Sequence, residues 1–154
     1  MSRAARARRQ RGIAAVEFAL ILPVFLVLLV LPLFMGRVLW HYTAAQKAAH
    51  DAVRYLASAS AQDMKDAARA SYVVDMAHSI AAAETAELNP GPGSIVITPM
   101  CDGTACDGLA LPATVTVTVR IRVDDIFFPN ATMDMLGSSS MLLTANATYP
   151  YVGL

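Results

Sequence analysis

The chain of 154 residues has few charged residues and few cysteines, and this scarcity excludes several classes of protein. Charged residues make up 16% of the chain, whereas typical soluble chains have about 25%. Basic and acidic residues balance at 12 each, which argues against a disordered polyelectrolyte and against a globally basic nucleic-acid-binding protein. Two cysteines are too few for a disulfide scaffold or a four-thiolate zinc site.

Short motifs that mark common catalytic sites are also missing. The sequence has no phosphate-binding loop, no dinucleotide-binding glycine pattern, no zinc-protease helix motif and no nucleophile elbow. The three histidines, His41, His50 and His78, have a spacing that fits no metal site, so we interpret them as solvated or interfacial. We interpret two acidic pairs as solvated charge: Asp63 with Asp66, and Asp124 with Asp125. The sequence therefore predicts no catalytic residue, no metal, no cofactor and no small-molecule substrate.

A long apolar run stands behind a basic N-terminus. Residues 1–12 have no acidic residue and five arginines, at Arg3, Arg6, Arg8, Arg9 and Arg11. Residues 13–36 have one charge, Glu17, and as a helix would span about 36 Å, against about 30 Å of bilayer hydrocarbon. We expect a single membrane-spanning helix over 13–36. The basic leader should stay in the cytoplasm because positive charge resists translocation.

Other interpretations of this segment fit less well. A buried core helix rarely runs this long without a polar face, and no small-residue cleavage site of a secretory signal follows the run. Pro23 and Pro32 leave two interpretations open: ordinary prolines of a membrane helix, or a deformable helix that can leave the bilayer for a filament. We expect a cation and aromatic rings to form the outer interfacial belt, at Arg37, Trp40, His41 and Tyr42.

The residues around Gly12 form a more specific pattern. From Arg8 the sequence runs R-R-Q-R-G-I-A-A-V-E-F-A-L-I-L-P. It resembles the class III signal of type IV pilin-like proteins, in which a prepilin peptidase cuts after the glycine and leaves the apolar helix attached. The resemblance places cleavage between Gly12 and Ile13. Glu17 would then be the fifth mature residue and Phe18 the sixth, and the mature chain would have 7 basic and 12 acidic residues.

Within that class, the segment looks like TadE/TadF-like minor pseudopilins of the tight-adherence (Tad, Flp) pilus system. The likeness lies in A-A-V-E-F-A-L-I-L-P and in the later A-A-Q-K-A-A-H-D-A-V-R-Y of residues 44–55. It implies a bacterial inner-membrane protein with a cytoplasmic N-terminus, a periplasmic C-terminal domain and a role in pilus assembly; incorporation into the pilus stays open. The implied partners are the prepilin peptidase, other Tad subunits, the inner-membrane assembly platform and membrane lipids.

Glu17 has two interpretations. An ionised carboxylate at the bilayer centre costs about 2.5–3.5 kcal/mol or more, but Glu17 lies near one end of the run, where a helix N-terminus favours negative charge. In related pilins this carboxylate is thought to pair with the N-terminal amine of a neighbouring subunit. The resemblance implies the same pairing for Glu17, and the alternative is a tolerated interfacial carboxylate without a role.

Residues 37–88 lack proline and glycine and are predicted to be helical. One stripe recurs at helical spacing, formed by Val38, Tyr42, Ala45, Ala49, Ala52, Leu56 and Ala59. It packs either onto the chain's own sheet or onto a partner pseudopilin. Ser60 and Asp63 resemble a capping box, so a second helix is predicted to begin there. The predicted stripe of that helix is Val73, Met76, Ile80 and Ala83.

The prolines and glycines of residues 89–93 end the helical region, and the period then changes to two. Residues 113–123 alternate valine or isoleucine with threonine or arginine, which predicts a strand with one buried face. Residues 94–100 and 141–149 are the other predicted strands. The expected fold is therefore α+β with a pilin-like layout: a transmembrane helix continuing into an alanine-rich helix, then a small antiparallel β domain over 94–154.

Cys101 and Cys106 lie on either side of a short turn sequence in the predicted exported domain. A disulfide between them is expected, because exported proteins form such bonds and no further ligand for a metal lies nearby. Two functions other than pilus assembly stay open. One is an unprocessed single-pass membrane protein with an external sensing or binding domain, and the other is an anchored enzyme, against which the missing catalytic motifs count.

Overall fold

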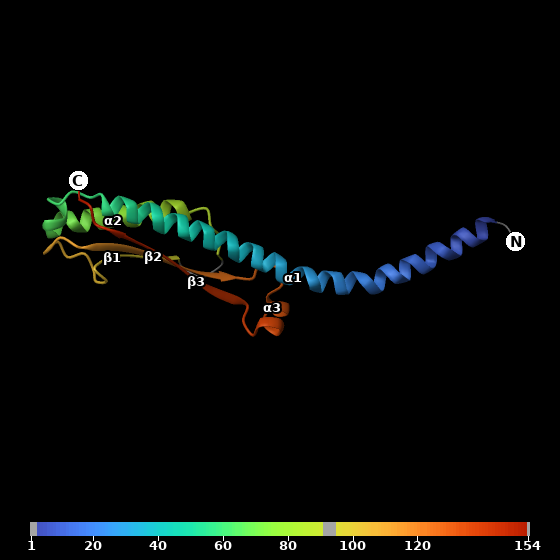
Figure 1. The fold of residues 1–154 in the computed structure, drawn as a ribbon. Helices are drawn as coiled ribbons and strands as arrows, with labels where there is room; N and C mark the ends of the chain where they lie inside the picture. Colours follow the sequence, from blue (N-terminus) through green and yellow to red (C-terminus); the bar gives the residue numbers. More distant parts are fainter. Residues whose placement is uncertain (1–2, 91–94, 154) are drawn as a thin grey trace.

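The computed structural model describes residues 3–90 and 95–153, with side chains described from Ala14 onward in these ranges. One long helix is followed by a short helical layer and a three-stranded antiparallel sheet (Figure 1). The elements are α1 (Arg3–Ala57), η1 (Asp63–Lys65), α2 (Ala67–Thr85), β1 (Ile95–Cys101), β2 (Thr114–Asp124), α3 (Pro129–Leu136) and β3 (Ser140–Pro150). The predicted α+β fold is confirmed.

Helix α1 has two halves with different surroundings. Side chains of residues 14–28 are exposed, and this half projects away from the rest of the chain (Figure 1). Burial begins at Val30 and continues to Ala57 along one stripe. The helix runs through both Pro23 and Pro32. The same helix therefore provides both an exposed apolar segment and a helix that packs in the folded domain.

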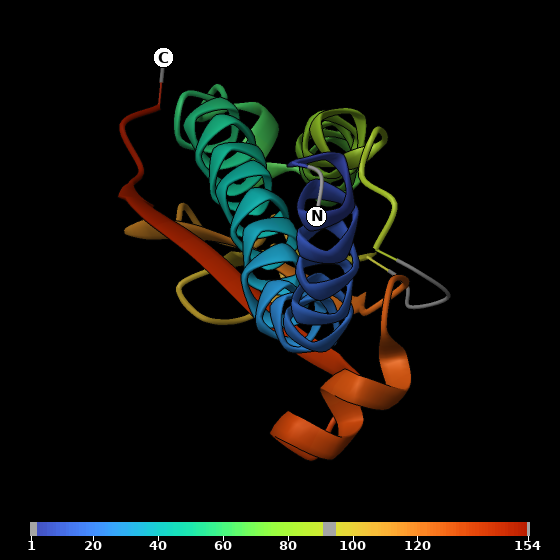
Figure 2. The same cartoon turned by 90° about the vertical axis from the view of Figure 1, so that its right-hand side faces the viewer.

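The packed half of α1 and helix α2 lie on the same face of the sheet (Figure 2). α1 contacts β2 and β3, and α2 contacts β1. The inward side chains of β2 are fully buried, at Val115, Val117, Val119, Ile121 and Val123. They face the alanines of α1, whose small side chains let helix and sheet approach closely. The predicted buried face of β2 is thus confirmed, although Thr118 of the predicted wet face is buried too. The predicted stripe of α1 packs on the chain's own sheet, with Tyr42 half-buried and Ala59 beyond the end of the helix.

The strand register determines which segments lie at each end of the domain. The sheet order is β1-β2-β3, with Asp124 opposite Ser140 at one end and Val115 opposite Tyr149 at the other. The amide of Val152 donates to the carbonyl of Ala57, so the C-terminal residues adjoin the end of α1. The connection holding α3 therefore lies at the end of the domain where α1 leaves it (Figure 1).

The helical region of residues 37–88 divides into two helices as predicted, but the second helix begins later than the predicted start at Ser60–Asp63. The Ser60 hydroxyl donates to Asp63, whose amide donates back to Ser60 at 3.1 Å. These bonds close a single 3-10 turn, and α2 begins only at Ala67. Its N-cap is Asp66, whose carboxylate accepts from the amides of Ala68 and Arg69. Asp66 therefore has a structural role that the solvated-charge interpretation missed.

The predicted stripe of α2 is only partly right. Its buried residues are Ala70, Val73, Ala77, Ala81 and Thr85. Met76 and Ile80 are half-buried and Ala83 is exposed. Alanine occurs on every face of this helix and does not distinguish the buried face. The prediction therefore followed the larger side chains, and the predicted stripe is displaced by about one residue from the buried one.

The three predicted strands are confirmed with end shifts of one residue or so. The predicted boundary at residues 89–93 and the predicted start of the first strand at Ser94 fall mostly on residues 91–94, which lie outside the described residues. Helix α3 was not predicted. It is two turns long, with Pro129 at its start and Gly137 in the left-handed conformation at its end, and such short helices carry too little periodicity to be recognised.

The expected disulfide joins Cys101 and Cys106. It closes a turn in which Asp102 adopts a positive φ of 49° and accepts hydrogen bonds from the amides of Ala113 and Thr114. These bonds lower the pKa of Asp102 below its ordinary value. The disulfide loop continues to Gly108, which packs directly on the first residue of α2. Disulfide and loop thus brace the end of the domain away from α3.

Candidate functional site

The predicted recognition residues lie on the exposed half of α1. Gly12 and Ile13 belong to the helical backbone, and their side chains, like those of Arg8, Arg9 and Arg11, lie outside the described residues. Glu17 and Phe18 are both exposed on the projecting half, with Phe18 64% exposed. The sheet domain therefore does not cover this face, which remains accessible to a membrane, a peptidase or another subunit.

The exposed half of α1 is almost entirely apolar. Its large exposed side chains are Val16, Phe18, Leu20, Ile21, Leu22, Val24, Phe25, Leu26, Val27 and Leu28. Within the described residues, α1 is long and apolar enough to cross a membrane. A helix inside a soluble core would be covered, whereas this one is bare on all sides. The arrangement fits a single-pass membrane protein.

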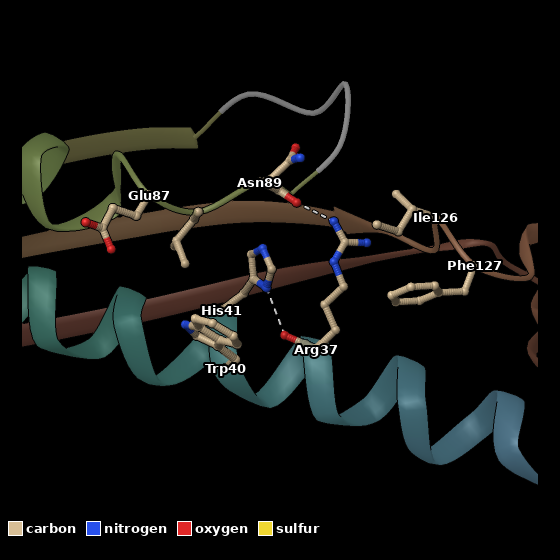
Figure 3. Close-up of a pocket in the computed structure, with 8 residues that line it drawn as sticks. Arg37, Trp40, His41, Glu87, Asn89, Ile126 and Phe127 are labelled. Atoms are coloured by element: carbon tan, nitrogen blue, oxygen red, sulfur yellow. Dashed lines mark hydrogen bonds between the residues drawn. The ribbon is translucent and has the colours of Figure 1, made fainter.

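Arg37 joins the start of the packed half of α1 to the sheet domain. One guanidinium nitrogen donates to the carbonyl of Asp124 at the end of β2. The other donates to the carbonyl of Asn89 after α2, as Figure 3 shows. Trp40, 70% exposed, lies one turn further along α1. Arg37, the cation predicted for the outer interfacial belt, thus binds two main-chain carbonyls of its own domain.

His41 is buried within its own domain, so the expectation that it is solvated is wrong. It is only 5% exposed, and its Nδ1 lies 2.8 Å from the carbonyl oxygen of Arg37. Its Nε2 finds no hydrogen-bond partner within the described part of the chain. His50 and His78 are exposed as expected, although the His50 ring contacts Tyr149 edge to face. The sheet domain covers the His41 side of α1, which sequence periodicity alone did not indicate.

Asp125 is also buried, contrary to the solvated-charge interpretation. It is 5% exposed, and its carboxylate accepts from the amides of Phe127 and Phe128 and from the hydroxyl of Thr132. Burial raises the pKa of Asp125, but these hydrogen bonds and the nearby charge of Arg37 outweigh it, so the pKa is lowered overall. Asp125 therefore holds the loop before α3 as a buried, hydrogen-bonded anion.

A shallow cavity of about 320 Å³ lies between α1, the end of α2 and the loop before α3. It is lined by Arg37, Trp40, His41, Glu87, Leu88, Asn89, Ile126 and Phe127 (Figure 3). Sequence reasoning missed Asn89, Ile126 and Phe127 as neighbours of Arg37. Only the adjacent Phe-Phe-Pro after two aspartates could have indicated a turn here.

The cavity offers no recognisable catalytic arrangement. Residues 3–90 and 95–153 contain no group of three or more His, Cys, Asp or Glu side chains that could hold a metal ion. Mostly apolar lining with one fixed guanidinium suits packing or binding better than bond-breaking chemistry. The features that distinguish this chain are therefore the bare apolar helix and its junction with the domain.

Comparison with known proteins also points to the apolar helix α1. The family model described as TadE-like protein matches residues 12–54. No curated protein and no solved structure matches the chain. The match begins at Gly12, covers the bare half of α1 and ends three residues before the helix does. TadE-like proteins are pilus components and are not a known family of enzymes. Residues 12–54 of the chain are thus similar to TadE-like proteins, as the sequence resemblance indicated.

Proposed function

We propose that the chain is a minor pseudopilin of a Tad (Flp) pilus, cut between Gly12 and Ile13 by a prepilin peptidase before it acts in pilus assembly. One observation carries the proposal: the family match starts at Gly12, and the apolar helix that follows is bare from residue 14 to residue 28. In this account the protein is a substrate and a structural part, and it catalyses no step itself.

The residues around Gly12 suit such processing. A peptidase must draw the backbone out of its helical geometry, and glycine, which has no Cβ, offers the least steric resistance to that change and to close approach. The five arginines of residues 1–12 would hold the scissile bond at the anionic cytoplasmic surface. The sheet domain would then lie in the periplasm, at the other end of the spanning segment.

After cleavage, Ile13 would have a new cationic amine one turn before the carboxylate of Glu17. Opposite charges in a poorly hydrated environment attract strongly, so the Glu17 carboxylate of one subunit can recognise the Ile13 amine of its neighbour. Because Glu17 is exposed and the domain leaves this face bare, the pairing needs no rearrangement of the fold. This interaction would fix the axial register between subunits.

Mass spectrometry of the protein co-expressed with the peptidase tests the processing. Gly12→Ala should leave a chain that still begins at Met1 or Ser2. The matched control is Gly36→Ala, in the same helix, where an added Cβ meets no atom within 4 Å. If Gly12→Ala is cut as readily as Gly36→Ala, the proposed role of Gly12 is wrong.

The second candidate is an unprocessed single-pass protein with an external binding domain. The cavity beside Trp40 favours it, because its mostly apolar lining could admit a small apolar ligand. The two candidates differ in their N-terminus. A wild-type chain that keeps residues 1–12 in cells with an active peptidase would favour the binding protein and contradict the pseudopilin.

A further inference from the structure

The connection between β2 and β3 is unusually apolar for a surface segment. Residues 126–136, here the 126–136 segment, read I-F-F-P-N-A-T-M-D-M-L, and Asp134 is their only charged residue. Six large apolar side chains of the segment are exposed: Ile126, Phe127, Phe128, Met133, Met135 and Leu136. These six side chains are here called the patch, and so many exposed apolar side chains in one short segment indicate an interaction surface.

The exposure of this patch is built into the fold. Asp125 fixes the start of the segment through the amides of Phe127 and Phe128, and it also accepts from the fully buried Thr132 of α3. At the other end, the amide of Gly137 donates to the carbonyl of Met133 at 2.9 Å. The segment is thus held at both ends with its apolar side chains outward.

The 126–136 segment lies beside the apolar half of α1. Helices α1 and α3 are in contact, and α3 lies where α1 leaves the domain (Figure 1). Burial of α1 begins there, at Val30 and Phe34. Both residues belong to the uncharged run from Phe18 to Gly36, so the domain already covers α1 within its predicted membrane-spanning part.

Helix length places this contact at membrane depth. The bare residues 14–28 alone span about 22 Å, less than the roughly 30 Å of bilayer hydrocarbon. The 19 uncharged residues between Glu17 and Arg37 span about 28 Å, which matches the bilayer. Phe34 lies about 4.5 Å along the axis before Arg37. For α1 to cross the bilayer, the residues beside α3 must enter the outer leaflet.

We propose that the 126–136 segment inserts into the outer leaflet of the membrane that α1 spans. Lipid covers the exposed apolar side chains of the segment, because they continue the lipid-facing surface of α1 and lie at the same depth. The segment lacks basic residues, so insertion depends on apolar burial and needs no anionic headgroup. Interfacial helices of this kind are buried about 5–10 Å deep. Insertion would fix the tilt and height of the domain above the bilayer.

Depth-dependent quenching tests the proposal on the full-length chain in phosphatidylcholine vesicles. In a Trp40→Phe background, which removes the single tryptophan, Phe127→Trp or Leu136→Trp places a fluorophore at an exposed position of the patch. Leu109→Trp is the control, because Leu109 is 82% exposed and lies just after the disulfide loop, at the end of the domain away from α3. Lipids brominated near the headgroup end of the acyl chains are the quencher.

Brominated lipid should reduce the fluorescence of both patch variants about twofold more than that of the control, as expected for interfacial burial. Equal quenching of patch and control variants, with equal access to aqueous acrylamide, would overturn the proposal. Protection that appears only when another pilus subunit is added would overturn it too, because the occupant would then be a protein.

Oxidative footprinting of the wild-type chain gives a second reading that needs no substitution. Met133 and Met135 are exposed in the fold, as is Tyr72 on α2. In vesicles, oxidation by aqueous radicals should fall several-fold at the two methionines relative to Tyr72. Undiminished oxidation of Met133 and Met135 would contradict lipid insertion. The proposal needs α1 to span the membrane but not the leader to be cut, so it and the proposed processing can fail separately.

Discussion

Arg37, two-thirds of the way along α1, donates a hydrogen bond to the main-chain carbonyl of Asp124, 87 residues later in the chain. Its second guanidinium nitrogen donates to the carbonyl of Asn89. One side chain thus joins the projecting helix to the end of β2 and to the segment after α2. Hydrogen bonds from a charged group contribute about 1.5–3 kcal/mol each, so Arg37 holds the domain firmly against the helix.

Replacing Arg37 by methionine should therefore lower the free energy of unfolding by about 2 kcal/mol, since the partly buried carbonyl of Asp124 and the exposed carbonyl of Asn89 lose their donor. Chemical unfolding in detergent, followed by near-ultraviolet circular dichroism, measures the change. Arg120→Met is the matched control, because Arg120 is exposed on the open face of the sheet, and it should shift stability by less than about 0.5 kcal/mol. Equal effects at the two positions would refute the bracing role.

Thr132→Val should destabilise the 126–136 segment, because the buried Asp125 carboxylate loses a hydroxyl donor. Leaving a buried acceptor short of a partner costs about 1–3 kcal/mol. Hydrogen exchange should then accelerate at the amides of Phe127 and Phe128 and leave the centre of β2 unchanged. Thr132→Ser keeps the hydroxyl and should restore the wild-type exchange pattern; if it exchanges as fast as the valine variant, the hydroxyl is not the cause.

Gly108→Ala should be more damaging than Gly103→Ala. Both glycines have a positive φ, so either substitution costs about 1 kcal/mol in backbone strain. At Gly108, however, the new Cβ would lie 2.6 Å from the Cα of Ala67, while at Gly103 it meets nothing within 4 Å. Thermal unfolding of the two variants should show a clearly lower Tm for Gly108→Ala, and equal Tm values would mean that the loop does not pack on α2 as described.

Asp102 should make stability depend on acid pH. Hydrogen bonds from the amides of Ala113 and Thr114 lower its pKa below 3.8. A carboxyl with a lowered folded pKa adds stability that is complete above its unfolded pKa and is lost as pH falls through the folded value. The stability gap between wild type and Asp102→Asn should therefore narrow below about pH 4. A gap that stays constant down to about pH 2 would contradict the role of the charge.

Glu17→Val should leave processing intact while impairing pilus assembly. The substitution removes the carboxylate that would pair with a neighbouring Ile13 amine, and it leaves Gly12 and the basic leader in place. Cleavage is read from the mature N-terminus and assembly from surface pili in the same cells. Normal piliation would mean that Glu17 is only a tolerated interfacial residue, the interpretation that the sequence left open.

Elements with strong periodicity could be predicted from the sequence, and elements set by long-range contacts could not. The spacing of the valines in β2 and of the alanine stripe in α1 predicts which of these side chains are buried. By contrast, Asp125 is buried only because the Thr132 hydroxyl and the Phe127 amide fold back on it. The sequence alone shows a pair of acidic residues that would be taken as exposed.

The candidate site shows the same division. Residues 8–23 carry a local pattern, so the leader motif and the apolar helix could be recognised without a structure, and the family match at residues 12–54 confirms the likeness. Burial of His41 and the bonds of Arg37 depend on residues about 50 and 90 positions away, Asn89 and Asp124 among them. No periodicity within α1 indicates those contacts.

The mass of the mature wild-type protein, purified from cells that contain the prepilin peptidase, tests the central proposal most directly. The account predicts a chain that starts at Ile13, shortened by residues 1–12, with the Cys101–Cys106 disulfide retained. A full-length chain that still begins at Met1 or Ser2, in cells where another pilin is cut normally, would contradict it.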